Sequence, residues 1–398
     1  MVTTGLGGVV AALLLATAIP ADPVMAPGVS RQTIKIGLHA PLTGASPVSS
    51  DSAEKGKDLY FRWLESEGRA IHGRDVEVVL RNDQYNPSTA VSVCKEMVEK
   101  DHVFMLVGLS GPDQMQACAR YAASVDVPYV GPGTTTLVLD ELDNYFATTM
   151  VHRQSGRLLA DFFIERLSAR ERKNGAVNFN GPNWAQPKRS FTRELTGRRA
   201  ELHYDRSVGP GAGIAEARTI VTELQAGGIR NVFVHTTPTW FLQLITQANE
   251  AGYNPTWSGV GPDMTRDAVL RAGCNGGTAV DKAKFLSPFP AVAEADRFDS
   301  HFRAAARERY PNTTPDDVMW HLWALEKVLA KMLTRAGETP TRARFIARVE
   351  RTDRIHTGVG PTLRYQPSDH FGARTSHLLT ADCADERWHT TKRFVRDF

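Results

Sequence analysis

A serine stands where a strand-to-helix turn is expected, in the stretch VGLSGPDQM. Ser110 follows an apolar run and precedes a helix that begins at Pro112. A serine at such a turn is the nucleophile of many hydrolases, whose signature is G-x-S-x-G. Pro112 takes the last position of that signature, so the pattern is broken. A secreted serine hydrolase is therefore the lower-ranked alternative, with Asp263 and His356 or His377 as possible triad partners.

Other short motifs do not complete a catalytic or cofactor site. The glycine-rich stretch GPGAG, residues 209–213, lacks the Lys-Ser/Thr that follows a phosphate loop, and its glycines do not form G-x-G-x-x-G. The 12 histidines show neither H-E-x-x-H nor another paired ligand spacing. The sequence therefore predicts no metal site and no cofactor.

Size and charge bound the remaining classes. A chain of 398 residues exceeds one comfortable hydrophobic core, so two domains are expected. The 47 basic and 44 acidic residues nearly cancel and leave a formal charge of +3. That balance gives no electrostatic argument for binding nucleic acid or an acidic membrane surface. Nucleic acid is therefore not an expected partner.

The N-terminus carries an apolar run, LGGVVAALLLATA, from Leu6 to Ala18. A membrane-spanning helix needs about 20 residues, so the run is too short to span a bilayer and suits the core of a signal peptide. No Lys or Arg precedes it, which departs from a typical signal peptide, and no lipid-anchoring cysteine follows it. We expect residues 1–26 to be a signal peptide or N-terminal tail, and the protein to be secreted, periplasmic or at the cell surface.

Four cysteines occur in the chain: Cys94, Cys118, Cys274 and Cys383. In an exported protein they indicate disulfides, and four cysteines permit three connectivities. No C-x-x-C is present, so neither a zinc cluster nor a thioredoxin-like redox site is expected.

Strands and helices alternate along the chain after the leader. Short apolar runs such as HVFMLVG alternate with segments of helical periodicity. The helix expected at DQMQACARYAAS has an apolar face made of Met115, Cys118, Ala119 and Ala122. Runs that are apolar throughout indicate strands buried on both faces, hence a parallel sheet covered by helices. A second such series begins after residue 156, and long helices at 295–310 and 316–337 follow it.

The order of these segments resembles the type I periplasmic solute-binding proteins, in particular the leucine/isoleucine/valine-binding branch that feeds ATP-driven importers of branched-chain amino acids. The resemblance runs from about Ile34 to Phe398 and rests on IKIGLHAPLTG, RNDQYNP, FMLVGLSG and VPYVGPGTTT. It implies an α/β fold of two lobes, each an open, mostly parallel sheet flanked by helices. The ligand would be held in the cleft between the lobes, which close by a hinge motion.

The resemblance also implies where the chain passes between the lobes. Crossings are expected near 147–151, 285–289 and 361–365. Lobe one then combines residues 31–149 with 287–360, and lobe two combines 150–286 with 361–398. The turn from Pro41 to Gly44 falls at the carboxyl end of the first strand, where open α/β sheets bind ligands.

In that family the recognition turns of lobe one follow the third and fourth strands. Ser110 and Gly111 form the first turn here, and the N–H groups of the following helix start can receive a carboxylate. The second turn, GPGTTT, places Gly133 to offer its carbonyl to an ammonium group. Thr135, beside Thr134, is placed to offer a hydroxyl to a carboxylate. A capped turn without ligand contact is the alternative for these residues.

Lobe two of the family contributes a G-P-acid stretch and an aromatic residue. Asp263 in SGVGPDMTRD fits the acid that meets a ligand ammonium group, with a helix N-cap as the alternative. Trp184 falls where relatives stack a ring over the ligand, and Thr237 lies with Trp240 in the next strand-end turn. Packing alone is the alternative for both aromatic residues. Ser49 matches a position where branched-chain binders use an aromatic, which indicates a bulkier solute or a differently shaped pocket.

Cys94 and Cys118 lie on the apolar faces of adjacent crossover helices, which favours pairing them, while Cys274 and Cys383 would both fall in lobe two. Free buried thiols are the alternative. The expected function is capture of a small amino-acid-like or carboxylate solute and its delivery to an ABC permease by a monomeric, non-enzymatic protein. A ligand-sensing receptor of the same fold is the alternative among binding proteins.

Overall fold

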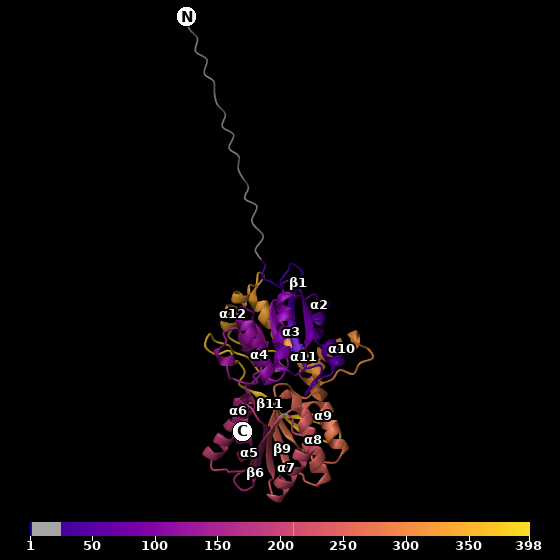
Figure 1. Cartoon of the computed structure of the whole chain (residues 1–398). Helices are drawn as coiled ribbons and strands as arrows, with labels where there is room; N and C mark the ends of the chain where they lie inside the picture. The colour runs from indigo at the N-terminus through magenta and orange to yellow at the C-terminus, as the bar shows by residue number, and fades with distance from the viewer. Residues whose placement is uncertain (2–24, 210) are drawn as a thin grey trace.

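The computed structural model describes residue 1 and residues 25–209 and 211–398, without the side chains of residues 262 and 263. The leader expected at 1–26 lies almost entirely outside these described residues. Figure 1 shows two lobes stacked one above the other, with the C-terminus in the lower one. Each lobe is built on its own sheet of mostly parallel strands, so the predicted two-lobed α/β fold is confirmed.

The first sheet has the strand order β2-β1-β3-β4-β5, and all its pairings are parallel. Strand β1 lies inside the sheet because it pairs on both sides: Ile36 lies opposite Val78 of β2 and opposite Met105 of β3. Its strands are β1 (Thr33–Ala40), β2 (Asp75–Asn82), β3 (Met105–Gly108), β4 (Tyr129–Gly131) and β5 (Tyr145–Ala147). The helices among them are α1 (Ser50–Gly56), α2 (Leu59–Ser66), α3 (Pro87–Glu99), α4 (Pro112–Ser124) and the short η1 (Leu139–Glu141).

The second sheet has the order β12-β11-β10-β9-β8-β6-β7, in which β11 and β12 run antiparallel to their neighbours. Its strands are β6 (Asn174–Phe179), β7 (Leu202–Val208), β8 (Asn231–His235), β9 (Thr256–Val260), β10 (Lys284–Ser287), β11 (Ser376–Asp382) and β12 (Arg387–Val395). The helices of this series are α5 (His152–Arg166), α6 (Pro182–Gly197), α7 (Ile214–Ala226), α8 (Pro238–Glu250), η2 (Pro262–Thr265) and α9 (Asp267–Asn275).

After β10 the chain returns to the upper lobe of Figure 1. Helix α11 (Asp317–Ala336) packs against α1, α2 and α12 (Arg342–Glu350). Its buried Glu326 accepts a hydrogen bond from the backbone N–H of Tyr60, at the start of α2, at 2.7 Å. The upper lobe therefore combines elements from two separate parts of the sequence, one before and one after the strands β6 to β10. The sequence did not predict α12, whose buried side chains are only Phe345 and Val349.

The last passage between the lobes comes late in the sequence. Phe371 forms a bridge with Ala147, the last residue of β5, and the Tyr365 hydroxyl donates to the Ala147 carbonyl at 2.9 Å. Leu363 pairs with Ala373 nearby. These contacts keep residues 363–373 beside the first sheet until β11 joins the second. The lobe boundaries given above stay predictions, and these contacts favour a final boundary near residue 374.

Two long helices expected from the sequence are interrupted by tertiary contacts. The segment 54–68 breaks after α1, whose Gly56 lies so close to α11 that an added Cβ would be 3.1 Å from the Met319 Cα. The segment 295–310 breaks between η3 (Val292–Arg297) and α10 (His301–Arg309). There the buried carboxylate of Asp299 accepts hydrogen bonds from Trp323 and Lys327 of α11. Periodicity alone does not reveal either contact.

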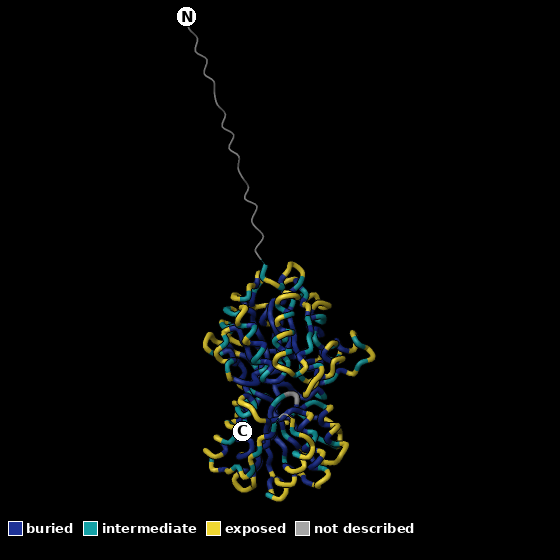
Figure 2. Tube along the Cα trace, viewed as in Figure 1, coloured by how far each residue is buried: buried dark blue, intermediate teal, exposed yellow. Residues whose placement is uncertain are grey.

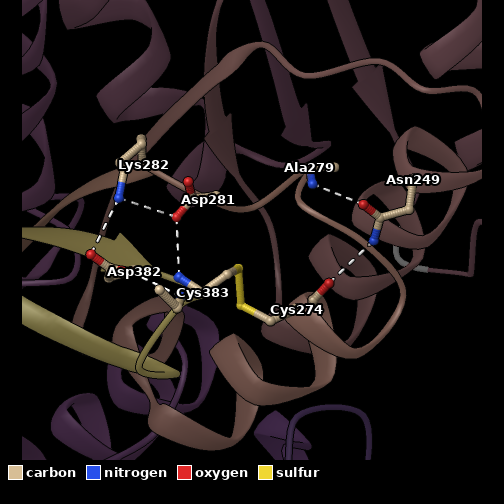
Figure 3. The surroundings of a disulfide bond; sticks show 9 residues. Asn249, Cys274, Ala279, Asp281, Lys282, Asp382 and Cys383 are labelled. Atoms are coloured by element: carbon tan, nitrogen blue, oxygen red, sulfur yellow. Dashed lines mark hydrogen bonds and ion pairs between the residues drawn. A yellow bond between two sulfur atoms is a disulfide. The ribbon is translucent and has the colours of Figure 1, made fainter.

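The structure pairs the four cysteines in two disulfides, Cys94–Cys118 between α3 and α4 and Cys274–Cys383 between α9 and the β11–β12 turn. Figure 3 shows the second bridge among polar contacts. Asp281 accepts the Cys383 backbone N–H at 3.1 Å, and Lys282 lies 3.2 Å from the Asp382 carboxylate. This disulfide therefore ties the C-terminal hairpin to the lobe that it completes.

Buried residues, drawn dark blue in Figure 2, fill the centre of each lobe. Large side chains such as Trp257, Trp320 and Trp388 are less than 2 % exposed. Among the described residues, no helix combines the length and apolar character that crossing a bilayer requires.

Helix α11 begins beside the other lobe with an acidic pair. Asp316 caps it by accepting the Met319 backbone N–H at 3.0 Å. Asp317 is 6 % exposed, and its Oδ2 atom has no hydrogen-bond partner among the described residues. Burial raises the pKa of Asp317 to about 7, with a further contribution from the charge of Asp316, although Arg266 opposes the shift.

Replacing Asp317 by Asn should remove a pH-dependent loss of stability. Between about pH 4 and 7 the folded protein binds more protons at Asp317 than the unfolded chain does, so the free energy of unfolding falls as pH rises. Denaturant titrations should show Asp317→Asn little changed near pH 4 and more stable than wild type above pH 7, by at most about 4 kcal/mol. The exposed Asp353→Asn serves as control, and a variant that gains nothing above pH 7 would contradict the shift.

Removing the Cys274–Cys383 bridge should cost more stability than removing Cys94–Cys118, because the closed loops span 109 and 24 residues of sequence separation. Chain entropy predicts losses of about 4 to 5 and about 3 kcal/mol in the free energy of unfolding. Double Cys→Ala variants compared by denaturant titration measure both losses. A reversed ranking would mean that local packing, rather than loop closure, sets the contribution of each bridge.

Candidate functional site

A cavity of about 90 Å³ lies between the lobes. Its wall includes residues that follow β3 and β4 of the first sheet and β8 and β9 of the second, so the carboxyl ends of both sheets face it. A single water needs about 10–15 Å³ on such a scale, so there is room for several waters or for a small organic molecule. Much of the wall is apolar: Val48, Leu109, Pro112, Val260, Met264, Phe289, Val318 and Leu325.

Five residues predicted to contact a ligand line this cavity. They are Ser110, Gly111, Thr134, Trp184 and Thr237. Thr237 also caps α8, where its hydroxyl accepts the Trp240 backbone N–H at 3.4 Å. Trp240 itself donates from its indole to the Ala212 carbonyl and does not belong to this wall.

The structure gives Gly133 and Thr135 other partners beside the cavity. The Gly133 N–H donates to the Thr149 hydroxyl at 2.8 Å, and its carbonyl accepts the His152 N–H at the start of α5. Thr135 is fully buried, and its hydroxyl donates to Asn183 Oδ1 at 2.9 Å in the other lobe. These two residues support the wall and the contact between lobes, and their predicted ligand contacts stay predictions.

Asp263, predicted to meet an ammonium group, falls in η2 directly after β9. Its side chain lies outside the described part of the chain. Gly261 and Met264, on either side of this position, line the cavity. Asp263 therefore follows the carboxyl end of β9, which faces the cavity. Its contact with a ligand ammonium group stays a prediction.

The turn that follows β1, from Pro41 to Gly44, positions a segment of the cavity wall. Asn82, at the end of β2, accepts the Leu42 N–H at 3.0 Å and donates to the Thr43 hydroxyl at 2.8 Å. Gly44 has a φ of +102°, and an added Cβ would lie 2.1 Å from the Gln84 carbonyl oxygen. This turn fixes the segment after it, from which Ser46 reaches the cavity wall. Ser49 instead caps α1.

Two hydroxyl groups in the wall have no hydrogen-bond partner among the described residues: Ser110 Oγ and Thr134 Oγ1. Leaving a buried polar group unsatisfied costs about 1–3 kcal/mol, so such atoms indicate a missing ligand or solvent group. Ser110 directly precedes Gly111, where α4 has no side-chain cap, and Thr134 lines the same cavity after β4. A bound group that accepts hydrogen bonds would satisfy both hydroxyls.

His235, at the end of β8, is held in the neutral form. Burial is the main cause that lowers its pKa to about 3, and the charge of nearby His152 adds to the effect. Its Nδ1 atom lies 3.2 Å from the Trp184 carbonyl oxygen. Since that carbonyl can only accept, Nδ1 carries the proton and Nε2 is left as an acceptor.

Arg266 brings a positive charge to the wall. Its Nη1 donates across the cleft to the Pro47 carbonyl at 2.8 Å. No carboxylate is found among the described side chains that line the cavity. Arg is the usual partner of an anionic group, so this guanidinium is a candidate for contact with one.

Hydrogen bonds join the lobes around the cavity. Asn183 Nδ2, in the first turn of α6, donates to Asp113 Oδ1 of α4 at 2.6 Å. Gln186 donates to the Thr136 hydroxyl at 3.0 Å, and the Thr239 hydroxyl donates to the Ala45 carbonyl at 3.1 Å. The described arrangement is therefore a closed one, with direct contacts between the lobes on more than one side of the cavity.

Several wall residues were not identified from the sequence: Ser46, Tyr85, His152, His235, Arg266 and His321. Strand-end placement could have indicated Tyr85, which follows β2 in the stretch RNDQYNP, and His235, which ends β8. His321 lies within α11, far along the chain, and no local pattern marks it as a wall residue.

The described residues do not assemble the triad that the hydrolase alternative needs. His356 Nδ1 contacts the Thr362 hydroxyl at 3.0 Å, and His377 Nε2 contacts the Val359 carbonyl at 3.1 Å. Neither histidine lines the cavity that contains Ser110. Because Ser110 Oγ has no hydrogen-bond partner among the described residues, no described base activates it as a nucleophile.

Solved structures of similar fold are solute-binding proteins. A fatty acid ABC transporter substrate-binding protein from Thermomonospora curvata superposes with a TM-score of 0.79 at 17% identity, over 94% of this chain and 95% of that one. An ABC transporter solute-binding protein from Rhodopseudomonas palustris BisB5, in complex with 3,4-dihydroxybenzoic acid, gives 0.74 at 16% identity, over 92% and 97%. The branched-chain amino acid transporter substrate-binding protein LivJ from Streptococcus pneumoniae, in complex with isoleucine, gives 0.75 at 17% identity, over 91% and 100%.

At these identities the likeness concerns the fold. No curated protein sequence matches the chain significantly. The family model described as periplasmic binding protein, however, matches residues 33–386, which contain every strand of the two sheets except β12 and every wall residue of the cavity between them. The chain therefore belongs to the periplasmic binding protein family.

Proposed function

We propose that this protein captures a small solute bearing a carboxylate, outside the cytoplasmic membrane, and delivers it as a monomer to the permease of an ABC importer. The observation that carries the proposal is the wall of the interlobe cavity. Arg266 lines it, Ser110 and Thr134 present hydroxyls without partners among the described residues, and no described carboxylate belongs to it.

The chemistry of the relatives' ligands supports a carboxylate as the recognised group. One of the three similar proteins is named for a fatty acid, and the other two are in complex with 3,4-dihydroxybenzoic acid and with isoleucine. A carboxylate is the group that these compounds share, whereas only isoleucine adds an ammonium group. The family is one of binding proteins, which supports a non-enzymatic role and a place outside the cytoplasm.

In this proposal the solute lies between the two lobes. Ser110, Thr134 and the start of α4 bind the carboxylate from one side, and Arg266 binds it from the other. Gly111 leaves space beside the turn, while Trp184 and Thr237 cover the apolar body of the solute. Closure of the lobes would then bury the solute, since the cavity has walls from both lobes.

An α-amino acid is the second candidate solute. It requires an acidic group for the ammonium, and Asp263 is the residue whose position after β9 favours that role. A ligand-sensing receptor of the same fold has no observation in its favour here.

Thr134→Val should weaken carboxylate binding without weakening the fold. The hydroxyl has no partner among the described residues, so losing it removes no internal hydrogen bond. A hydrogen bond to a charged group contributes about 1.5–3 kcal/mol, which predicts a loss of affinity of about 10- to 150-fold. Calorimetric titration with a panel of aliphatic and aromatic carboxylic acids measures the affinity, and thermal unfolding of the unliganded protein measures the stability.

The matched control is Thr219→Val, which changes a hydroxyl on α7 that bonds only to the Ala215 carbonyl in the same helix. It should leave every affinity unchanged. If Thr134→Val binds each acid within twofold of wild type, the hydroxyl does not contact the solute and the proposed carboxylate position is wrong.

Asp263→Asn separates the two candidate solutes. If the carboxylate of Asp263 contacts an ammonium group, the variant should bind α-amino acids with an affinity lower by about 10-fold or more, because a charge-assisted hydrogen bond is weakened. Acids without an amine should bind as before. The same titration panel provides the measurement, and an equal loss for both classes of compound would assign Asp263 to local structure instead of recognition.

A further inference from the structure

A second space adjoins the ligand cavity. This side chamber has a volume of about 340 Å³, against about 90 Å³ for the cavity. The two spaces share three wall residues, Tyr85, Trp184 and Thr237. The two spaces are therefore neighbours that adjoin at these three side chains.

Both lobes build the side chamber. Ala45, Pro87 and Gln114 line it from the upper lobe, and Phe179, Trp240 and Gln243 line it from the lower one. The interlobe hydrogen bond from Thr239 to the Ala45 carbonyl joins two of its wall residues. Like the cavity, the chamber is therefore complete only when the lobes are closed.

Three aromatic residues form part of the lower wall of the chamber, beside the polar Asn180, Thr239 and Gln243. The rings of Phe179 and Trp184 meet edge to face with centroids 5.3 Å apart, and Phe179 meets Trp240 in the same way at 5.8 Å. Trp240 is fixed by its indole N–H, which donates to the Ala212 carbonyl at 3.0 Å. Burial of an apolar chain or ring against these aromatic side chains would be favourable.

Tyr85, on the opposite wall, is firmly positioned. Its φ of 54° lies in the left-handed region, and its N–H donates to Asp83 Oδ1 at 2.9 Å. Asp83 is in turn fixed by buried His39, 2.7 Å away. Strained, well-held residues of this kind cluster at ligand clamps. An added Cβ at Gly111 would lie 2.7 Å from the Tyr85 hydroxyl, so the glycine makes room for this ring.

The chamber also contains a polar atom that lacks a partner. The amide oxygen of Gln243, in α8, is buried and has no hydrogen-bond partner among the described residues. A hydroxyl group can bond to either end of an amide side chain. The part of the chamber beside Gln243 is therefore suited to a hydroxyl at the end of an apolar body.

We propose that the solute is an elongated acid, whose carboxylate occupies the cavity and whose apolar body passes between Tyr85 and Trp184 into the side chamber, where Gln243 binds a distal hydroxyl. This inference rests on the proposed function, because it extends the same solute from the same carboxylate site. Short acids would use the cavity alone, and longer ones would add the contacts of the chamber.

A series of unbranched acids tests the proposal on the full protein. Affinities of alkanoic acids and of their ω-hydroxy counterparts are measured by calorimetric titration. Each methylene that enters the chamber should raise the affinity about fourfold. Once the chain reaches Gln243, the ω-hydroxy acid should bind about fivefold tighter than its parent.

Two variants locate these gains. Ala212→Phe places a ring in the chamber without touching the cavity, so it should abolish the gain with chain length and leave the shortest binding acids unchanged. Gln243→Leu should keep the gain with length and lose the preference for the hydroxyl. Ala251→Phe, an exposed position at the end of α8, is the matched control and should behave as wild type.

The outcomes separate this inference from the function on which it rests. If short acids bind but affinity does not rise with length, and Ala212→Phe changes nothing, the chamber is only an entrance filled with solvent and the inference is wrong. The proposed function then stands. If no acid of any length binds, the carboxylate proposal fails, and this inference fails with it.

Discussion

The hydrogen bonds that Asn183 makes across the cleft hold this structure in its functional shape. The side chain, from the lower lobe, donates to Asp113 and accepts from Thr135, both of the upper lobe. Neither sheet forms a closed cavity alone, because each only presents the carboxyl ends of its strands to the other. The cavity and the side chamber both depend on this contact and its neighbours being made. These bonds are made by polar side chains, and bonds of this kind suit a cleft that must also open to release its contents.

The cavity wall is less polar than the hydrogen-bonded contact that closes it. Its wall is largely apolar, and its polar groups are hydroxyls, imidazoles and one described guanidinium, Arg266. Burial keeps His235 neutral, so the positive charge of the wall does not depend on that imidazole at ordinary pH. A small number of fixed hydrogen-bond donors then orient the anionic group, while burial of apolar surface binds the rest of the solute. Such a division gives strict selection of one functional group and tolerance in the rest of the molecule.

The fold could be predicted from the sequence because buried residues form a clear pattern along the chain. Apolar runs predicted parallel strands, and the spacing of Met115, Cys118 and Ala122 predicted a helix face that is indeed buried. The turns after the strands pointed to Ser110, Thr134 and Trp184, which line the cavity. Local pattern says nothing, however, about partners far along the chain. The break between α1 and α2, the place of His321 in the wall and the antiparallel addition of β11 all depend on such long-range packing.

The division of each lobe between distant parts of the sequence has a consequence for biosynthesis. The upper sheet is complete by residue 147, yet its covering helices α10 to α12 come only after strands β6 to β10 of the second sheet. The lower sheet still lacks β11 and β12 until the last residues of the chain. A nascent chain that emerges N-terminus first therefore completes the upper lobe only late in its synthesis and the lower lobe only with its last strand. Such a chain stays incompletely folded through most of its synthesis, the state in which a polypeptide can still be threaded through a translocation channel.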